Sequence, residues 1–217
     1  EPVCFIPVSA REGDNIANHS DKMPWYKGMN VLEVLDSFKS EELPEDMPFR
    51  MPVQDVYKFT RGGDNRRIIA GTIETGKISV GDEVIFYPSG KRTRIKTIEG
   101  FNREPVTEIG AGWATGFTAT EQIYVKRGEL MCRADELKPK VTGRMLVNLF
   151  WLGKNPLVKD KDYYLKLGTA KVGMRVEEIR NVIDASTLAG RKKDRVDRNE
   201  VAECILSLER HIAFDLT

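Results

Sequence analysis

The pattern of hydrophobic and polar positions predicts one helix near the N-terminus and a series of strands after it. Residues 2–8 form a short, almost continuous apolar run, as in a strand that is buried on both faces. The range 29–38 has helical spacing instead, with apolar positions at Val31, Val34, Leu35 and Phe38. Asn30 and Glu33 can form a capping box at its start. Strand, loop and helix together predict a small α/β unit.

From Phe49 onward the helical spacing disappears and short β-rich runs alternate with turn residues. The first group of predicted strands comprises residues 51–57, 67–74, 83–87, 93–98 and 122–125, and its turns lie at 62–65, 81–82 and 88–90. A second group has longer runs at 141–152, 163–167, 171–184 and 201–208. The charged stretch 191–200 is expected to be a solvated loop. Many short strands with regular turns predict barrels or sandwiches.

Two segments divide the chain. The acidic segment 40–48 contains two prolines and is expected to be a linker, and residues 137–140 form a second, shorter joint. We therefore predict a mainly β protein: an α/β unit with its linker at residues 1–48, a β-barrel at 49–137 and a second β-barrel at 138–217. The chain starts and ends in apolar runs, although natural domains rarely expose unpaired strands. We expect a piece of a longer protein, with the second barrel truncated.

Composition excludes several classes of protein. The 217 residues include 34 Lys and Arg against 33 Asp and Glu, so the net charge of +1 gives no reason for the whole surface to bind nucleic acid or a membrane. Cys4, Cys132 and Cys204 lie far apart without a CxxC pair, which predicts buried thiols in a reducing compartment. No apolar run approaches the roughly 20 residues of a membrane span, and no signal peptide is visible. We expect a cytoplasmic protein.

One motif imitates a phosphate-binding loop and is rejected. Residues 71–77 (GTIETGK) match GxxxxGK, but Ile78 stands where a Ser or Thr should hold Mg²⁺. A functional loop also opens a helix, whereas the following residues have a strand and turn pattern with Gly81. We predict a structural turn.

Other candidate residues favour structural roles. Arg92, Arg94 and Lys96 share one strand face that could contact phosphates, although a solvated strand is the favoured interpretation. The basic run 191–195 is likewise expected on the surface. His19 and His211 have no partner pattern that would indicate catalysis, and the aromatic residues Trp25, Tyr26 and Trp151 favour packing roles. The residues alone predict no catalytic and no metal-ligating site.

Resemblance to a known family extends this picture. Residues 5–15 (FIPVSAREGDN) and 23–28 (MPWYKG) resemble the end of a translation-factor-type GTPase domain, and Ser9-Ala10 matches the fifth guanine-nucleotide motif of such domains. Residues 52–57 (PVQDVY), 70–76 (AGTIETG) and 80–84 (VGDEV) resemble the second domain of these proteins, a β-barrel. Residues from 138 onward resemble their third domain, also a barrel. The resemblance covers the whole chain.

Within this superfamily the chain resembles the large GTPase subunits of bacterial sulfate adenylyltransferase. The matching stretches are 67–72 (RIIAGT), 87–90 (YPSG), 94–98 (RIKTI), 121–130 (EQIYVKRGEL), 150–152 (FWL), 164–168 (YLKLG) and 176–180 (VEEIR). The MPWY sequence is shared with elongation factor 1-alpha. The Pro-Gly-Asp of elongation factors is absent, and residues 110–116 (GAGWATG) stand in its place.

The resemblance implies a function for the parent protein. In this family the large subunit binds and hydrolyses GTP, which drives a small catalytic subunit to make adenylyl sulfate and pyrophosphate from ATP and sulfate. The free energy of forming the phosphosulfate anhydride is strongly unfavourable, so its formation is coupled to GTP hydrolysis. The implied partner is the small subunit, and some members are fused to an adenylyl-sulfate kinase. The parent would be a nucleotidyltransferase that uses GTP and Mg²⁺.

Ser9 and Ala10 are the only residues to which the resemblance assigns a functional role of the family. The Ala10 N–H would donate to the guanine carbonyl oxygen, while Ser9 would shape the loop. The P-loop, the switch motifs and the NKxD-type motif would lie upstream of residue 1, so we expect residues 1–48 to be the remnant of a GTP-binding domain. The chain alone is then expected to be inactive and to bind no cofactor.

Two alternatives remain from the residues. An elongation-factor-like fragment would use its barrels to hold aminoacyl-tRNA, and would need a basic groove and salt-dependent RNA binding. A free-standing β-barrel interaction protein would need neither nucleotide nor RNA.

Overall fold

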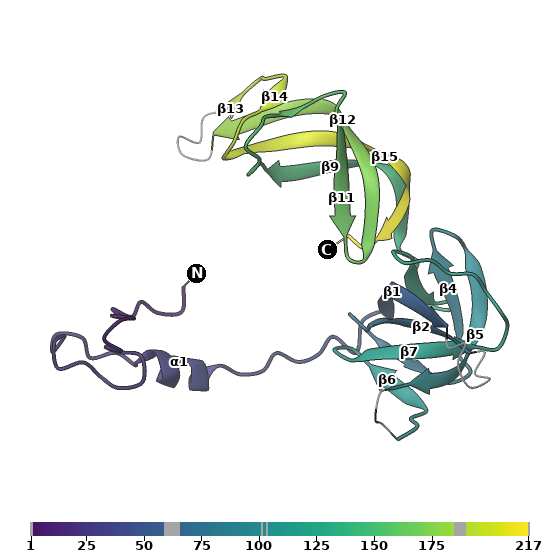
Figure 1. Cartoon of the computed structure of the whole chain (residues 1–217), viewed down its shortest axis with the longest axis horizontal. Helices are drawn as coiled ribbons and strands as arrows, with labels where there is room; N and C mark the ends of the chain where they lie inside the picture. The colour runs from purple at the N-terminus through teal and green to yellow at the C-terminus, as the bar shows by residue number, and fades with distance from the viewer. Residues whose placement is uncertain (1, 59–65, 101, 103, 185–189, 217) are drawn as a thin grey trace. The chain divides into compact units, whose positions relative to one another are not determined.

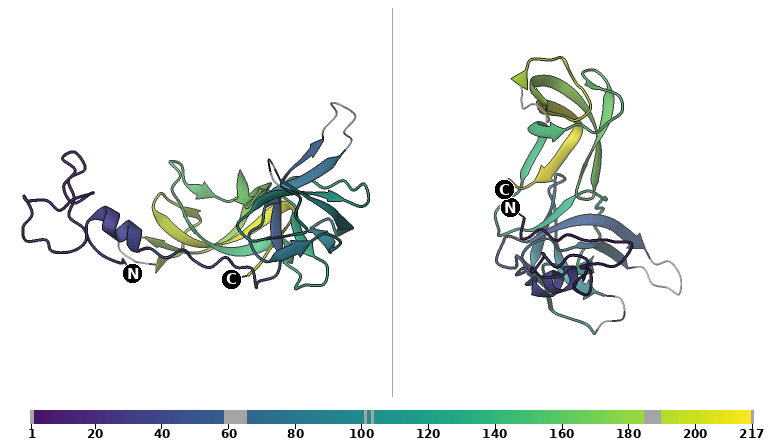
Figure 2. Two further views of the ribbon diagram at one scale, coloured as in Figure 1. Left: turned by 90° about the horizontal axis from the view of Figure 1, so that it is seen from below. Right: turned by 90° about the vertical axis from the view of Figure 1, so that its left-hand side faces the viewer.

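The computed structural model describes residues 2–58, 66–100, 102, 104–184 and 190–216. It divides into two compact units, Glu1–Glu42 and Leu43–Thr217. The elements of both units can be followed in Figure 1 and, from two further directions, in Figure 2. None of the helices in the described ranges has the length and hydrophobicity of a membrane span. The mainly β fold predicted from the sequence is confirmed.

The first unit is built from turns and one helix, α1 (Val31–Ser37). The predicted capping box forms: Glu33 N donates to Asn30 Oδ1 at 3.0 Å, and Asn30 N donates to Glu33 Oε2 at 2.8 Å. The expected strand at residues 2–8 was wrong, because these residues have no strand partner and Val3 and Phe5 are exposed. A strand buried on both faces needs neighbours in a sheet, and the described part of this unit offers none.

The second unit begins with a closed antiparallel barrel in the order β1-β2-β7-β5-β4-β8. Its strands are β1 (Arg50–Lys58), β2 (Arg67–Thr72), β4 (Glu83–Tyr87), β5 (Lys91–Glu99), β7 (Ala114–Ala119) and β8 (Leu130–Arg133). β3 (Lys77–Ser79) and β6 (Glu108–Gly110) form a separate two-stranded ribbon. Alternate residues of the strands point inward and are buried, among them Met51, Val53, Val84, Phe86, Phe117 and Met131.

The barrel confirms most predicted strands and corrects one of them, because no strand forms at residues 122–125. β6, β7 and β8 were not predicted. β7 has the sequence ATGFTA, and its Ala, Gly and Thr residues give little hydrophobic alternation, although four of its residues are buried. The predicted turn at residues 62–65 lies outside the described residues.

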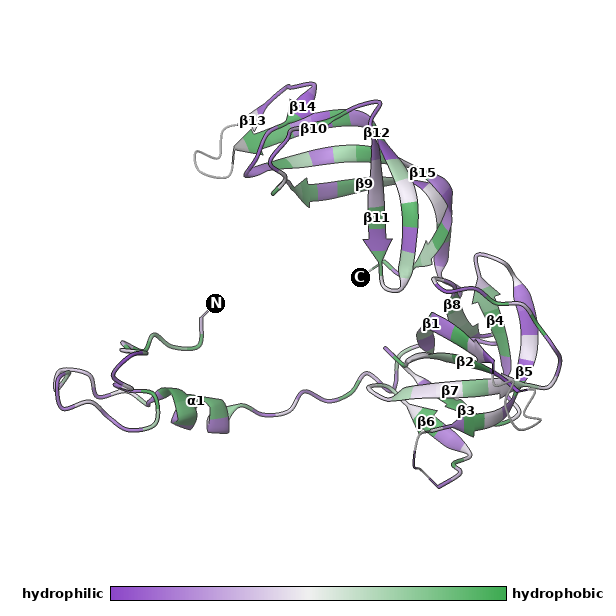
Figure 3. Cartoon of the chain, viewed as in Figure 1, coloured by the Kyte–Doolittle hydropathy of each residue, from purple (hydrophilic) through white to green (hydrophobic). Residues whose placement is uncertain are grey.

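The remaining strands form a second β domain. These are β9 (Lys140–Phe150), β10 (Leu157–Val158), β11 (Asp162–Leu167), β12 (Ala170–Asp184), β13 (Gly190–Arg191), β14 (Arg195–Val196) and β15 (Glu200–Phe214). One sheet has the order β11-β12-β15-β9, with β13 beside β12, and β10 pairs with β14. Hydrophobic and hydrophilic residues alternate along β12 (Figure 3). The described hydrogen bonds close the first barrel, whereas in this second domain they leave β9 and β11 at the ends of an open sheet.

The charged stretch 191–200 is solvated only in part. Arg191, Lys192, Asp194 and Arg195 are exposed, which confirms the surface position predicted for the basic run, but the stretch also contains β14, whose Val196 is fully buried. Lys193 donates to the carboxylates of Asp197 and Glu200, and Asp197 N donates to Glu200 Oε2 at 2.7 Å. Lys193, Asp197 and Glu200 therefore satisfy one another, which explains how a buried Glu200 is tolerated.

Arg50 joins the barrel to the end of the chain. Its side chain is buried, with Nε 2.7 Å from Asp215 Oδ2 and a terminal nitrogen 3.0 Å from Asp215 Oδ1. The guanidinium also donates to the carbonyl oxygens of Phe49 and Leu137. One side chain thus contacts β1, the connection before β9 and the segment after β15.

Candidate guanine loop and basic cleft

The two residues predicted to contact guanine lie at the start of a tight turn. Ser9 pairs with Asp14 as an isolated bridge, and Gly13 N donates to the Ser9 carbonyl oxygen at 2.8 Å. Ala10 is exposed at the beginning of this turn. Within the described residues no acceptor pairs with the Ala10 N–H. A free, exposed backbone donor in a fixed turn has the chemistry needed to bind a carbonyl oxygen.

Asn15 fixes the shape of this loop. It is buried with φ of 55°, and its side-chain nitrogen donates to the Pro7 carbonyl oxygen at 2.8 Å. Its side-chain oxygen accepts from Ser20 N, also at 2.8 Å. The backbone oxygen of Asn15 accepts from Val31 N at the start of α1. Asn15 therefore connects the residues before Ser9, the polar loop after it and the helix.

The cations of this loop pair with its own carboxylates. Arg11 lies 3.8 Å from Glu12, and Lys22 lies 3.8 Å from Glu12 and 3.6 Å from Asp14. No group of three or more His, Cys, Asp and Glu residues in the described ranges could hold a metal ion. The described residues of this loop therefore offer a backbone donor at Ala10 and no metal-ligating cluster.

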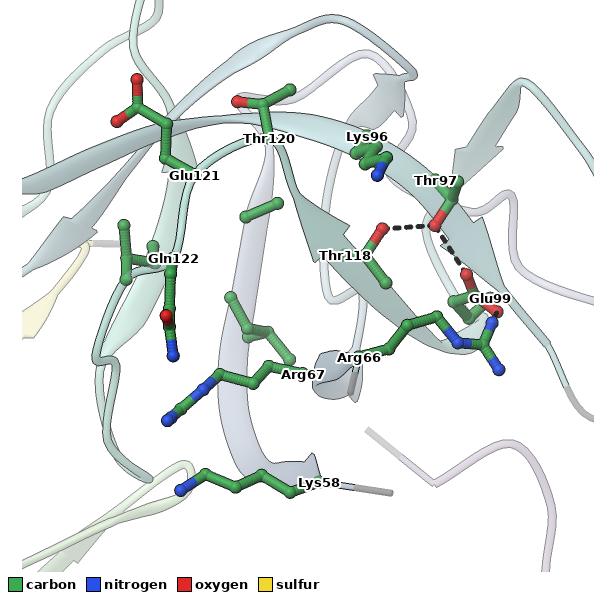
Figure 4. A pocket seen from close by; sticks show the side chains of 13 residues that line it. Lys58, Arg66, Arg67, Lys96, Thr97, Glu99, Thr118, Thr120, Glu121 and Gln122 are labelled. Atoms are coloured by element: carbon green, nitrogen blue, oxygen red, sulfur yellow. Dashed lines mark hydrogen bonds and ion pairs between the residues drawn. The ribbon is translucent and has the colours of Figure 1, made fainter. Parts of the chain in front are cut away.

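A second candidate site is a basic cleft on the wall of the barrel, with a cavity volume of about 860 Å³. Its residues come from the end of β1, from β2, β5 and β7, and from the loop after β7 (Figure 4). Four cationic side chains line it: Lys58, Arg66, Arg67 and Lys96. Ile69, Ala119 and Ile123 contribute its apolar surface.

Arg67 is held in place by neutral neighbours. Its guanidinium carbon lies 4.6 Å from the centre of the Tyr124 ring, a cation–π contact. The Gln122 amide, oriented so that its oxygen faces Arg67, accepts from Nε at 3.2 Å and from a terminal nitrogen at 3.3 Å. Neither contact neutralises the charge, so Arg67 presents a positioned cation to the cleft.

Arg66 is arranged differently, because a carboxylate neutralises it. Its guanidinium donates to Glu99 Oε2 at 3.0 Å. Thr97 Oγ1 donates to Glu99 Oε1 at 2.6 Å and also hydrogen-bonds Thr118 Oγ1. This network joins Arg66, the residue before β2, to β5 and β7, and it fixes one wall of the cleft (Figure 4).

The sequence identified part of this cleft. Arg92, Arg94 and Lys96 do share an exposed face of β5, as predicted. Glu83 pairs with Arg92 at 3.0 Å and with Arg94 at 3.4 Å, so the first two cations face a carboxylate on β4. Only Lys96 of this row lines the cleft. Lys58 and Arg67 were missed because they come from other strands, and no local spacing shows that the barrel brings them together.

The remaining motifs have structural roles. Residues 71–79 form the end of β2, a turn and β3, so the rejection of a phosphate-binding loop is confirmed. Gly76 is required by φ of 73° and by the Phe49 backbone, whose nitrogen would lie 2.6 Å from an added Cβ. His19 and His211 are exposed, as expected. Cys132 and Cys204 are buried, whereas Cys4 is exposed, which corrects the prediction for that residue.

Trp25 and Trp151 differ in their packing. Trp151 makes an edge contact with Tyr163, with ring centres 5.9 Å apart, and its Nε1 donates to the Asn155 carbonyl oxygen. Trp25 contacts Tyr26 in the same geometry but is largely exposed. The predicted packing role therefore holds for Trp151, and Trp25 belongs to the exposed apolar surface of the first unit.

Comparison with known proteins gives relatives along the whole chain. Residues 144–217 match the family described as GTP-eEF1A C-terminal domain-like. The chain is 35% identical over 214 residues to sulfate adenylyltransferase subunit 1 of Chromobacterium violaceum, which covers 97% of this chain and 43% of that protein. It is 34% identical to the protein of the same name from Sulfurovum sp. strain NBC37-1, covering 97% of this chain and 45% of that protein.

Solved structures show the same fold. Sup35 complexed with GDP superimposes with a TM-score of 0.70 at 22% identity, over 95% of this chain and 50% of that one. Sup35 complexed with GMPPNP gives a TM-score of 0.68 at 21% identity, with the same coverage. The chain spans less than half the length of the curated relatives that it matches. The chain is therefore similar over 97% of its length to part of sulfate adenylyltransferase subunit 1, and it has the fold of the matched half of Sup35.

Proposed function

We propose that this chain is part of the large, GTP-binding subunit of a sulfate adenylyltransferase. In that role its two β domains bind the small catalytic subunit and relay the nucleotide state to it. The observation that carries the proposal is identity of 33–35% along 97–99% of the chain to proteins named sulfate adenylyltransferase subunit 1. The reaction of the complete enzyme joins ATP and sulfate into adenylyl sulfate and pyrophosphate.

Ser9 and Ala10 form the guanine contact in this proposal. The Ala10 N–H donates to the guanine carbonyl oxygen, and Ser9 holds the turn through its carbonyl oxygen and its pairing with Asp14. The Asn15 side chain holds Pro7 against the loop through a hydrogen bond to the Pro7 carbonyl oxygen. GTP, when bound with its Mg²⁺, supplies the free energy of hydrolysis, and the phosphate-binding residues come from outside these 217 residues.

Exposed apolar residues of the first unit support a larger GTP-binding domain. Phe5 and Trp25 are 83% and 70% exposed, and Leu32, Leu35 and Phe38 on and beside α1 are also exposed. Side chains of this size normally lie in a core or an interface. In the proposed subunit they pack against the rest of the GTP-binding domain. The proposal keeps the cytoplasmic location expected from the sequence, and a fused adenylyl-sulfate kinase stays a prediction.

Binding of aminoacyl-tRNA is the weaker candidate. A groove that follows an RNA backbone needs a continuous row of free cations. On β5 that row is interrupted, because Glu83 pairs with Arg92 and Arg94.

A competition assay tests the proposed function. Adenylyl sulfate formation is measured with the complete two-subunit enzyme from Chromobacterium violaceum, ATP, sulfate and GTP, while the 217-residue chain is added in increasing amounts. We expect saturable inhibition, because the chain occupies the small subunit without driving it, and no product from the chain with the small subunit alone. Absence of inhibition at a large excess of chain would contradict the docking role.

The guanine contact is tested in a fusion of the first part of the Chromobacterium violaceum subunit to this chain. Ala10→Pro removes the N–H donor, and we expect GTP affinity to fall about tenfold or more, as for a lost hydrogen bond to a buried partner. Ala10→Ser keeps the N–H and is the matched control. Equal GTP affinity of the proline and serine variants would exclude Ala10 as the donor. Saturable GTP binding by the 217-residue chain alone would contradict the proposal that the phosphate site lies elsewhere.

A further inference from the structure

We propose that the basic cleft binds an extended acidic segment of a protein partner, with an apolar side chain between its carboxylates. The cleft is the one lined by Lys58, Arg67 and Lys96 around Ile69, Ala119 and Ile123. This proposal is independent of the proposed adenylyltransferase role, because it rests only on the charge and shape of the barrel wall.

The cleft carries positive charge that the described residues leave unneutralised. Lys58, Arg67 and Lys96 form no ion pair with any carboxylate in the described part of the chain. Glu99 is already bound by Arg66 and Thr97. The Glu121 side chain points away from Arg67 and Lys58 (Figure 4). A ligand with carboxylates would therefore meet three available cations.

The cations stand at two ends of the cleft. Arg67 and Lys58 extend toward the same end, and Lys96 lies at the other, beside Thr97 and Thr118 (Figure 4). Ile69, Ala119 and Ile123 also line the cleft and give it an apolar surface. Cations at two ends of a cleft with an apolar lining match a peptide with acidic residues on both sides of an aliphatic one.

Arg67 is preorganised for a carboxylate. Its stacking on Tyr124 and its contact with Gln122 restrict the side chain before a ligand arrives, so binding loses less conformational entropy. A guanidinium also binds a carboxylate through two parallel hydrogen bonds, which a lysine cannot do. Arg67 is therefore the main anchor, and Lys58 and Lys96 add charge.

Two observations favour a peptide over a polynucleotide. The cation row on β5 ends at Lys96, since Arg92 and Arg94 face Glu83, and the whole chain has a net charge of only +1. The Tyr124 ring is covered on one face by Arg67, so that face cannot stack a base. The positive charge is thus confined to one short cleft.

Fluorescence anisotropy with the 217-residue chain tests the proposal. The probe is a labelled decapeptide with two glutamates on each side of a leucine, and its control replaces the glutamates by glutamines. We expect saturable binding of the glutamate peptide only, which weakens as salt is raised. Arg67→Gln should weaken binding about tenfold, and Lys58→Gln or Lys96→Gln about threefold, as for charge-assisted contacts near the surface.

Arg92→Gln, which removes a cation outside the cleft, is the matched control and should leave the Kd unchanged. Thermal unfolding of each variant verifies that the barrel is intact, and Arg67→Lys, which keeps the charge, should bind with intermediate affinity. No saturable binding, or equal binding of the glutamine peptide, would overturn the proposal. Displacement of the peptide by a ten-nucleotide RNA at lower concentration, weakened by Arg92→Gln, would assign the surface to nucleic acid instead.

Discussion

Arg50 and Asp215, 165 positions apart in the chain, form a two-point contact between a buried guanidinium and a partly exposed carboxylate. Arg50 belongs to the first strand of the barrel, and Asp215 follows the last strand of the second β domain. Leu137, in the connection between the two, gives its carbonyl oxygen to the same guanidinium. The Arg50 side chain therefore links the first strand of the barrel, the connection at Leu137 and the segment at Asp215, in addition to the hydrogen bonds of the sheets.

We predict that removing this contact destabilises the chain. Arg50→Ala leaves the carbonyl oxygens of Phe49 and Leu137 without their donor, and should lower the free energy of unfolding by about 2–3 kcal/mol. Asp215→Asn keeps the shape but loses the charge and should lower it by about 1–2 kcal/mol. Urea unfolding followed by tryptophan fluorescence measures both.

The matched control for these variants is Arg175→Gln. Arg175 pairs with Asp162 at 2.6 Å, but both side chains are exposed, so we expect no measurable change. If all three variants unfolded at the same urea concentration, the Arg50 contact would have no special role in stability.

A second prediction concerns Gly76 and Gly81, which both have positive φ. Gly81→Ala introduces only left-handed strain, since nothing lies within 4 Å of the added Cβ, and should cost about 1–2 kcal/mol. Gly76→Ala adds a clash with the Phe49 backbone, at 2.5 Å from Cα, and should be clearly more destabilising. Chemical unfolding of the two variants measures the difference, and equal losses would show that the Phe49 backbone moves away freely.

The charge cluster around Lys193 predicts a dependence on alkaline pH. Hydrogen bonds to Glu200 and then to Asp197 raise the pKa of Lys193 above its ordinary value. A raised pKa means that the folded state holds the proton more tightly, so this contribution is complete below the ordinary lysine pKa and is lost as pH rises through the folded value. Lys193→Met should therefore be destabilising at pH 8, with a difference from the native chain that shrinks in the alkaline range.

Lys192→Met serves as the control for this pH series, because the neighbouring Lys192 forms no ion pair with the described residues. Its unfolding free energy should differ from that of the native chain by the same small amount at every pH. A Lys193→Met difference that stayed constant up to strongly alkaline pH would show that the buried Glu200 does not depend on the lysine charge.

The three thiols should react very differently. Burial raises the pKa of the Cys132 thiol to about 12, and burial also raises the pKa of Cys204. The thiolate is the reactive form, so both should resist a thiol reagent at pH 8 while exposed Cys4 is modified. Mass spectrometry should find one modified residue in the folded chain, three in urea and none in folded Cys4→Ser. Rapid labelling of Cys132 without denaturant would show that the barrel opens there.

Strand positions were predictable where β-branched and aromatic residues follow one another between turns, as in residues 83–87, which are a strand in both the prediction and the structure. β7 was missed because small residues that are buried look like turn residues. The network of Lys193, Asp197 and Glu200 was missed because charges that satisfy one another have the same composition as charges that face water. Of Lys58, Arg67 and Lys96 in the basic cleft, only Lys96 was in the predicted row, since the pairing of β1 with β2 joins Lys58 to Arg67, and β7 lies between β2 and the strand of Lys96.

The closed barrel has a consequence for how such a surface can change. Because every strand of the barrel is paired on both sides, the backbone hydrogen bonds of the wall do not depend on the side chains that point outward. Ligand preference on that wall is then carried by a few side chains such as Arg67 and Lys96. Substitution of single outward-facing residues can therefore change which ligand the barrel binds, while the backbone of the barrel stays the same.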